Sequence, residues 1–206
     1  MDECLAGPGE PLSIHLSQVA ECVRERGAAV ARKLAKVYNI SIEEAEDLLV
    51  FVAYAHDVGK TDVEYRDAVD TFRRHEAKST AAAYEAMRKS EVLKDCKNLD
   101  SVYAAALVAV AMHHYVHKEP RSGIDVRGYR RRCRPPVDAW QPKSELGRRL
   151  RQALLEVEEA GVLCYLKIIE SLSKLPEKTR YAAMAILGVL NQCDREVAQR
   201  NRKTQR

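Results

Sequence analysis

The sequence predicts an all-α protein. Apolar residues recur at the three- and four-residue spacing of a helix face through most of the chain, and no segment sustains the two-residue alternation of a half-buried strand. The 206 residues, 46% of them hydrophobic and 31% charged, suit a chain that folds around one core. We therefore expect a helical bundle with residues 1–206 forming a single domain.

The first two helices are expected on either side of Asn39. One apolar face predicts a helix that begins after Pro11 and ends near Asn39, and its members are Leu16, Ala20, Val23, Val30, Leu34 and Val37. The residues from Ser41 to Glu44 form a capping-box pattern, which opens a second helix. The apolar face of this helix runs to its C-terminal end and places His56 and Asp57 there.

Five more helices are expected from the same periodicity. They cover residues 75–87, 100–117, 144–160, 162–172 and 177–199. Between the second and third of these, residues 118–143 contain four prolines, two glycines and six arginines without helical period, which predicts a long basic loop or insertion. The polar tail 200–206 is expected to fray.

Cysteines and targeting signals exclude several classes. The six cysteines are widely scattered with no C-x-x-C pair, so we expect buried or incidental thiols rather than a zinc knuckle or a redox motif. The first 13 residues lack the basic and apolar parts of a signal peptide, and the longest apolar stretch, residues 102–112, is too short to span a bilayer. These features predict a cytoplasmic protein without membrane contact.

His56 and Asp57 are the central chemical signal. An ionisable pair at the end of an apolar helix face is costly to bury without a partner, and a metal ion is one such partner. For an isolated His-Asp pair, a local hydrogen bond at the helix end is the more common explanation. The other histidines favour the metal, because His15 borders an apolar face, and His113 and His114 lie on or next to another. Adjacent histidines point about 100° apart on a helix, so both can reach one ion only near a helix end.

These residues form a family pattern. The motifs are HLSQV at His15, AHDVGK around His56 and Asp57, RHEAKS at His75, AMHH ending at His114, and NQCD ending at Asp194. In this order they resemble the HD-domain superfamily of metal-dependent phosphohydrolases. More narrowly, the chain is similar to the HD nuclease of CRISPR type I interference, in the form where the nuclease is a separate subunit from its helicase. The resemblance extends from His15 to about Ala198.

The resemblance implies an HD-domain bundle with two divalent metal ions, chosen among Mn, Fe, Co, Ni and Mg. One ion would be held by His15, His56, Asp57 and Asp194, and the second by Asp57, His75, His113 and His114. Lys60 would help to hold the scissile phosphate, although a solvated cation at a helix end is an equally simple role. Ser79 matches a small hydroxyl residue near the family's site.

Three positions depart from the family or leave alternatives open. Tyr115 stands where the nucleases usually have glycine, and His117 is an additional histidine that is either a ligand or a surface residue. Asp194 competes with four other carboxylates near the HD motif, which are Asp47, Asp62, Asp67 and Asp70. A helix face shared with Met184, Leu187 and Asn191 favours Asp194.

The basic loop suggests the substrate. Its arginines are Arg121, Arg127, Arg130, Arg131, Arg132 and Arg134, and Tyr129 and Trp140 lie among or after them. Arginine pairs with phosphates and aromatic rings stack on bases, which suits single-stranded DNA, with RNA as a second candidate. The resemblance implies a helicase subunit and a CRISPR interference complex as partners. Two alternatives are an HD phosphohydrolase acting on small deoxynucleotides or cyclic nucleotides, and a helical adaptor that binds nucleic acid without catalysis.

Overall fold

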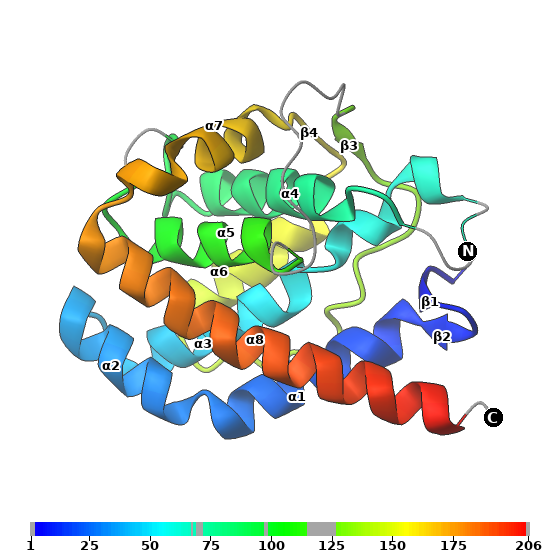
Figure 1. The fold of residues 1–206 in the computed structure, drawn as a ribbon, viewed down its shortest axis with the longest axis horizontal. Coiled ribbons are helices and arrows are strands. Elements are labelled where there is room, and N and C mark those ends of the chain that lie inside the picture. Colours follow the sequence, from blue (N-terminus) through cyan, green and yellow to red (C-terminus); the bar gives the residue numbers. More distant parts are fainter. Residues whose placement is uncertain (1–2, 67, 69–71, 97–98, 115–126, 205–206) are drawn as a thin grey trace.

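The computed structural model describes residues 3–66, 68, 72–96, 99–114 and 127–204, and it confirms the all-α prediction (Figure 1). The α-helices are α1 (Leu12–Arg26), α2 (Ala28–Tyr38), α3 (Ile42–Ala55), α4 (His75–Lys89), α5 (Val102–Met112), α6 (Glu145–Leu155), α7 (Leu163–Ser171) and α8 (Glu177–Thr204). Short 3-10 turns are η1 (Val58–Thr61), η2 (Val63–Tyr65) and η4 (Leu172–Lys174). Two small antiparallel pairs complete the described chain, β1 (Leu5–Gly7) with β2 (Glu10–Pro11), and β3 (Tyr129–Arg130) with β4 (Glu159–Ala160).

Helix α5 forms the centre of the bundle. Its sequence is apolar on every side, and residues 104–111 are all buried, as expected for a helix surrounded by others. α4 and α8 pack directly against it, and α8 also lies along α1 (Figure 1). The long α8 therefore joins the core helix to the N-terminal part of the chain.

Helix α3 begins where the sequence predicts. Ser41 Oγ accepts from the Glu44 backbone N–H at 3.0 Å, and Glu44 Oε2 accepts from the Ser41 N–H at 2.9 Å, which completes the capping box. The helix ends at Ala55 with His56 as its C-cap. The prediction that His56 and Asp57 lie at a helix end is confirmed.

The prediction of one continuous first helix is wrong. The chain turns at Gly27, between α1 and α2, and Val37 is 38% exposed rather than part of the buried face. A Cβ at position 27 would lie 2.5 Å from Val23 O and 2.9 Å from Leu49 Cδ1. Only glycine therefore allows this corner to pack against α3.

Other boundaries differ as well. α5 ends at Met112 rather than near residue 117, and α6 ends at Leu155 because the chain then forms β4 against β3. The predicted loop 118–143 contains the strand β3 and an isolated bridge between Asp62 and Arg131. α8 continues to Thr204, although the sequence predicts an end near Gln199 and fraying from residue 200.

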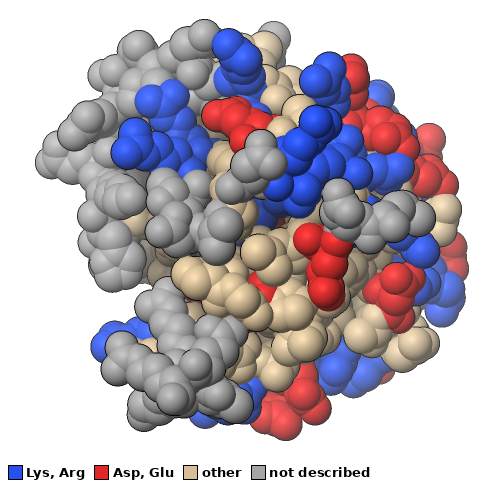
Figure 2. All heavy atoms as spheres, turned by 90° about the vertical axis from the view of Figure 1, so that its right-hand side faces the viewer, with Lys and Arg blue, Asp and Glu red and all other residues tan. Residues whose placement is uncertain are grey.

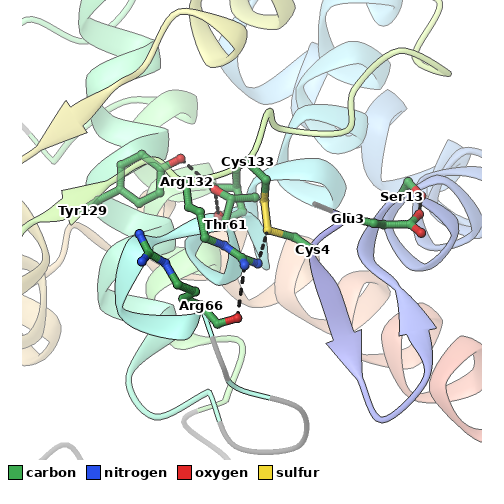
Figure 3. The surroundings of a disulfide bond; sticks show 9 residues. Glu3, Cys4, Ser13, Thr61, Arg66, Tyr129, Arg132 and Cys133 are labelled. Carbon is green, nitrogen blue, oxygen red and sulfur yellow. Dashed lines mark hydrogen bonds between the residues drawn. A yellow bond between two sulfur atoms is a disulfide. The ribbon is translucent and has the colours of Figure 1, made fainter. Parts of the chain in front are cut away.

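Four of the six cysteines are paired, which corrects the expectation of buried or incidental thiols for these four, whereas Cys96 and Cys164 are buried free thiols as expected. One disulfide joins Cys4 to Cys133 across a sequence separation of 129 residues (Figure 3). A second joins Cys22 to Cys193 across 171 residues. Partners this far apart leave no local spacing signal, because connectivity cannot be deduced from cysteine positions alone. Among the described residues, no helix combines the length and the apolar character needed to cross a membrane.

Candidate metal centre

The predicted ligands converge because most of them occupy helix ends. His15 lies in the first turn of α1, His56 caps α3, and His75 begins α4. His113 caps α5, so the helix ends where two adjacent histidines must reach one site. Asp194 alone comes from the interior of a helix, α8.

Backbone carbonyls orient three of the imidazoles. The Nδ1 atoms of His56, His75 and His113 donate to carbonyl oxygens three residues earlier, at 2.7, 2.6 and 2.6 Å respectively. A carbonyl only accepts, so each Nδ1 carries the proton and each Nε2 of the neutral ring presents its lone pair. Nε2 is therefore the atom that each ring offers to a ligand.

One group of ligand atoms forms around Asp57 Oδ2. His56 Nε2 lies 3.6 Å and His15 Nε2 3.7 Å from this oxygen. Asp194 Oδ1 approaches the same two rings, at 3.0 Å from His15 Nε2 and 3.7 Å from His56 Nε2. These are the four residues expected to share one ion.

A second group forms around the other oxygen of the same carboxylate. His75 Nε2 lies 2.9 Å and His113 Nε2 3.6 Å from Asp57 Oδ1. His75 Nε2 is also 3.3 Å from His113 Nε2 and 2.9 Å from His114 Nε2. Asp57 thus faces one histidine group with each oxygen, as the bridging role expected for it requires.

The arrangement fits divalent cations. In each group, ligand atoms of at least three residues lie within 4.8 Å of one another. His15 Nε2, His56 Nε2 and Asp57 Oδ1 are buried without a well-formed hydrogen bond in the described chain. The lone pairs of His75 and His113 also face each other, which is repulsive unless a cation lies between them. Imidazole and carboxylate donors suit first-row transition metals.

Lys60 stabilises the charge of the central carboxylate. Burial raises the pKa of Asp57, but Lys60, His56 and His75 outweigh this effect and hold the pKa well below its usual value. Lys60 is itself buried, and its Nζ donates to Asp57 Oδ2 at 2.7 Å and to Ala6 O at 2.8 Å. The alternative of a solvated helix-end cation is therefore wrong.

The pKa values of His15 and His114 shift in opposite directions. Burial lowers the pKa of His15, but the carboxylates of Asp194, Glu10 and Asp57 outweigh this effect and raise it to about 9. Burial lowers the pKa of His114 to about 2, with repulsion from His113 and His75 adding to the effect. The imidazoles of His15 and His56 overcome the burial of Asp194 and lower the pKa of this carboxyl. His15 thus favours its charged form beside acidic partners, whereas His114 is held neutral.

Gly59 and Ser79 fix the turn that follows α3 against α4. We call this turn, residues 56–61, the HD turn. Ser79 Oγ accepts from the Gly59 N–H at 2.8 Å, and Ser79 is fully buried. This contact agrees with the expected place of a small hydroxyl residue near the site. It lies between the His56-Asp57 turn and the helix that begins with His75.

The structure separates Asp194 from two of its competitors. Asp47 accepts hydrogen bonds from the backbone N–H groups of Lys143 and Ser144, and Asp62 accepts from Lys78 and from the Arg130 N–H. Both carboxylates support other segments. The helix face predicted for Asp194 was partly wrong, because Met184 is 61% exposed whereas Leu187 is buried.

Five of the predicted positions lie outside the described residues: Asp67, Asp70, Tyr115, His117 and Arg121.

The predicted nucleic-acid arginines divide by exposure. Arg127 and Arg130 are exposed and line a groove of about 920 Å³, together with Arg66, Lys78 and the carboxylates Asp62, Glu64, Glu85 and Glu159. Arg134 is exposed as well and pairs with Asp138 at 3.0 Å. Figure 2 shows Lys and Arg side chains gathered on the upper part of one face of the molecule. Arg127 and Arg130 therefore remain available to phosphates.

Arg131 and Arg132 are bonded within the protein. Arg131 pairs with Glu158 and donates to Leu155 O, while Arg132 donates to Arg66 O at 3.1 Å and contacts Cys4 Sγ at 3.0 Å (Figure 3). The expectation that Tyr129 and Trp140 stack on bases is wrong. Tyr129 is buried with its OH on Thr61 Oγ1, and Trp140 is buried against Tyr54.

Sequence reasoning missed the carboxylate of Glu10, which accepts from His15 Nδ1 at 2.9 Å. It also missed Asn201, whose Nδ2 donates to the same Glu10 oxygen at 2.5 Å. Neither residue belongs to a motif or shares a helix face with the ligand that it supports. Only the nearness of an acidic residue to His15 in the sequence offered a signal.

Comparisons with known proteins identify the family of this chain. A family model described as "Cas3, HD domain" matches residues 5–195. No curated protein matches the chain. A solved structure described as the crystal structure of a CRISPR-associated protein aligns with a TM-score of 0.42 and 14% sequence identity, covering 89% of this chain and 25% of the other. The chain thus spans about a quarter of the length of that relative.

Proposed function

This chain belongs to the family of Cas3 HD domains, and we propose that it is a metal-dependent nuclease that hydrolyses phosphodiester bonds of single-stranded DNA in CRISPR antiviral defence. RNA is a second candidate substrate. A helicase subunit of an interference complex would supply the single strand in the cytoplasm. The observation that carries the proposal is the carboxylate of Asp57, whose two oxygens each face a separate group of histidine nitrogens.

The proposed site holds two divalent ions. His15, His56 and Asp194 would hold one, and His75, His113 and His114 the other, with Asp57 shared between them. Bound ions would supply the Lewis-acid chemistry of phosphodiester hydrolysis, and Mn, Fe, Co, Ni and Mg are all candidates.

The protein's own groups orient this centre. The carbonyls behind His56, His75 and His113 keep Nδ1 protonated, so Nε2 stays unprotonated and aimed inward. Lys60 keeps Asp57 ionised, and it is our candidate for contact with the scissile phosphate because its ammonium lies 2.7 Å from Asp57 Oδ2. Arg127 and Arg130 would bind phosphates farther along the strand, and Arg134 is a third exposed candidate.

Cleavage of a circular single-stranded DNA with added Mn²⁺ tests the proposal, because circles report internal cuts. We expect linear and shorter products from the unmodified protein, and intact circles with His56→Ala and Asp57→Asn. Glu145→Gln is the matched control, since Glu145 is an exposed carboxylate of α6 paired with Arg148, and it should retain full activity. Intact circles with every metal tested would reject the endonuclease.

A parallel assay with mononucleotides separates the main alternative. The same site with a small substrate would release phosphate from deoxynucleotides or open cyclic nucleotides faster than it cuts oligonucleotides. Binding of DNA that weakens steeply with salt, without any metal-dependent product, would instead indicate an adaptor. Metal analysis of the purified protein completes the test, because the nuclease predicts bound ions that are absent from Asp57→Asn.

A further inference from the structure

His15 is held differently from three other histidines of the centre. His56, His75 and His113 each donate through Nδ1 to a backbone carbonyl three residues earlier. The Nδ1 of His15 donates instead to a side chain, Glu10 Oε1, at 2.9 Å. The hydrogen-bond partner of His15 is therefore a side chain, which a substitution can remove, whereas the partners of these three rings belong to the backbone.

The position of His15 in its helix explains the difference. His56 and His113 cap the C-terminal ends of α3 and α5, where the last carbonyls have no N–H partner within the helix. His15 lies near the N-terminal end of α1, where the carbonyls accept from the following turn. A partner from outside the helix is therefore needed to orient this ring.

Glu10 is built into that role. It lies on β2, one residue before Pro11, and is only 7% exposed. Its Oε1 also accepts from Asn201 Nδ2 of α8, at 2.5 Å, and Asn201 donates to Gln18 Oε1 of α1 at 3.0 Å. The Glu10 carboxylate is therefore held in place by contacts that link β2 to α1 and α8, in addition to its bond with His15.

We propose that Glu10 is the positioning residue of His15, which keeps its Nδ1 protonated and aims its Nε2 at the ion shared with His56, Asp57 and Asp194. This inference rests on the metal centre of the proposed function. A carboxylate on the far nitrogen of a ligand histidine fixes the tautomer and the ring orientation and increases the basicity of the ligand nitrogen. Asn201 then acts one step farther out, by holding Glu10.

Calorimetric titration of the metal-free protein with Mn²⁺ measures the affinity for each ion and tests the proposal without an activity assay. The variants are Glu10→Ala, Glu10→Met, which retains apolar volume but no acceptor, and Glu10→Gln, which retains an acceptor oxygen. Glu3→Ala is the matched control, because Glu3 is an exposed glutamate of the same segment that bonds Ser13 Oγ at 3.1 Å. Thermal unfolding of each metal-free variant verifies that it is folded.

We expect Glu10→Ala and Glu10→Met to bind one ion about 10- to 100-fold more weakly, with the affinity for the other unchanged, and Glu10→Gln to recover most of the affinity. Glu3→Ala should bind like the unmodified protein. Unchanged affinity for both ions in the folded Ala and Met variants would overturn the role of Glu10, while leaving the metal centre intact. Failure of the unmodified protein to bind Mn²⁺ would instead reject the metal centre itself.

Discussion

Gly59 offers a sharp test of how the HD turn is positioned. It lies in η1, two residues after Asp57, and packs against the start of α4. A Cβ at this position would lie 2.3 Å from His75 O, 2.6 Å from Ser79 N and 2.7 Å from Ser79 Oγ. Two of these atoms belong to the backbone, so a change of rotamer cannot relieve the contact.

The size of the effect follows from these distances. Cβ contacts shorter than 3.0 Å are essentially never found, so the Gly59→Ala variant must separate the turn from His75 O by about 0.7 Å, the gap between 2.3 and 3.0 Å. Overpacking of this kind costs about 1–3 kcal/mol, and each kcal/mol lowers Tm by about 2–4 °C in a chain of this length. The same movement separates Asp57 from His75, and a misplacement near 1 Å can reduce activity by about 100-fold.

Thermal unfolding and Mn²⁺ titration of Gly59→Ala measure both effects. Gly188→Ala is the matched control: Gly188 lies within α8, and a Cβ there would meet nothing within 4 Å. Since alanine favours a helix by about 1 kcal/mol over glycine, the control should unfold at a higher temperature. If Gly59→Ala matched the unmodified protein in Tm and in metal affinity, the close packing between the HD turn and α4 would be refuted.

Three further predictions concern metal, charge and covalent links. Mn²⁺ at 100 times its dissociation constant should stabilise the protein by about 2.7 kcal/mol for each site, and a chelator should reverse the rise in Tm; an unchanged Tm contradicts the metal centre. The double variant Arg127→Ala and Arg130→Ala should bind single-stranded DNA more weakly. The slope of log K against log salt concentration should become shallower by about 0.7 for each phosphate that an arginine no longer neutralises, whereas Arg148→Ala on α6 should bind like the unmodified protein. Cys22→Ser removes the link from α1 to Cys193, which adjoins Asp194, and should lower the free energy of unfolding in urea by about 2–4 kcal/mol; a midpoint equal to that of the unmodified protein argues against the disulfide.

Local signals in the sequence were enough to predict the helices that carry the HD motif. The capping box at Ser41 and the apolar face ending at His56 depend on residues within a few positions of one another, and both were found as expected. The same holds for α5, although its end at Met112 came earlier than its apolar pattern suggested. The break at Gly27 was missed because a single glycine inside a helical pattern does not by itself end the helix, and its close contact with Leu49 of α3 leaves no mark in the local sequence.

The arginine-rich segment shows a second limit of sequence reasoning. Composition counts charges but does not reveal which of them are neutralised by distant partners. Arg131 pairs with Glu158, 27 residues away, and Arg132 meets Cys4, 128 residues away. Arg127 and Arg130 have the same local surroundings in the sequence, yet they face solvent at the groove.

The candidate metal centre contains ligands of both kinds: some are oriented by residues close in the sequence, and others depend on distant parts of the chain. His56, His75 and His113 are oriented by carbonyls only three residues away, so each short motif already contains most of the geometry of its ligand. His15 instead depends on Glu10, which is held in turn by Asn201, 191 residues from Glu10 along the chain. Asp194 adjoins the Cys22–Cys193 link, which spans 171 residues. A change in the N-terminal hairpin or near the end of α8 should therefore weaken the ion near His15 and leave the ion near His75 bound.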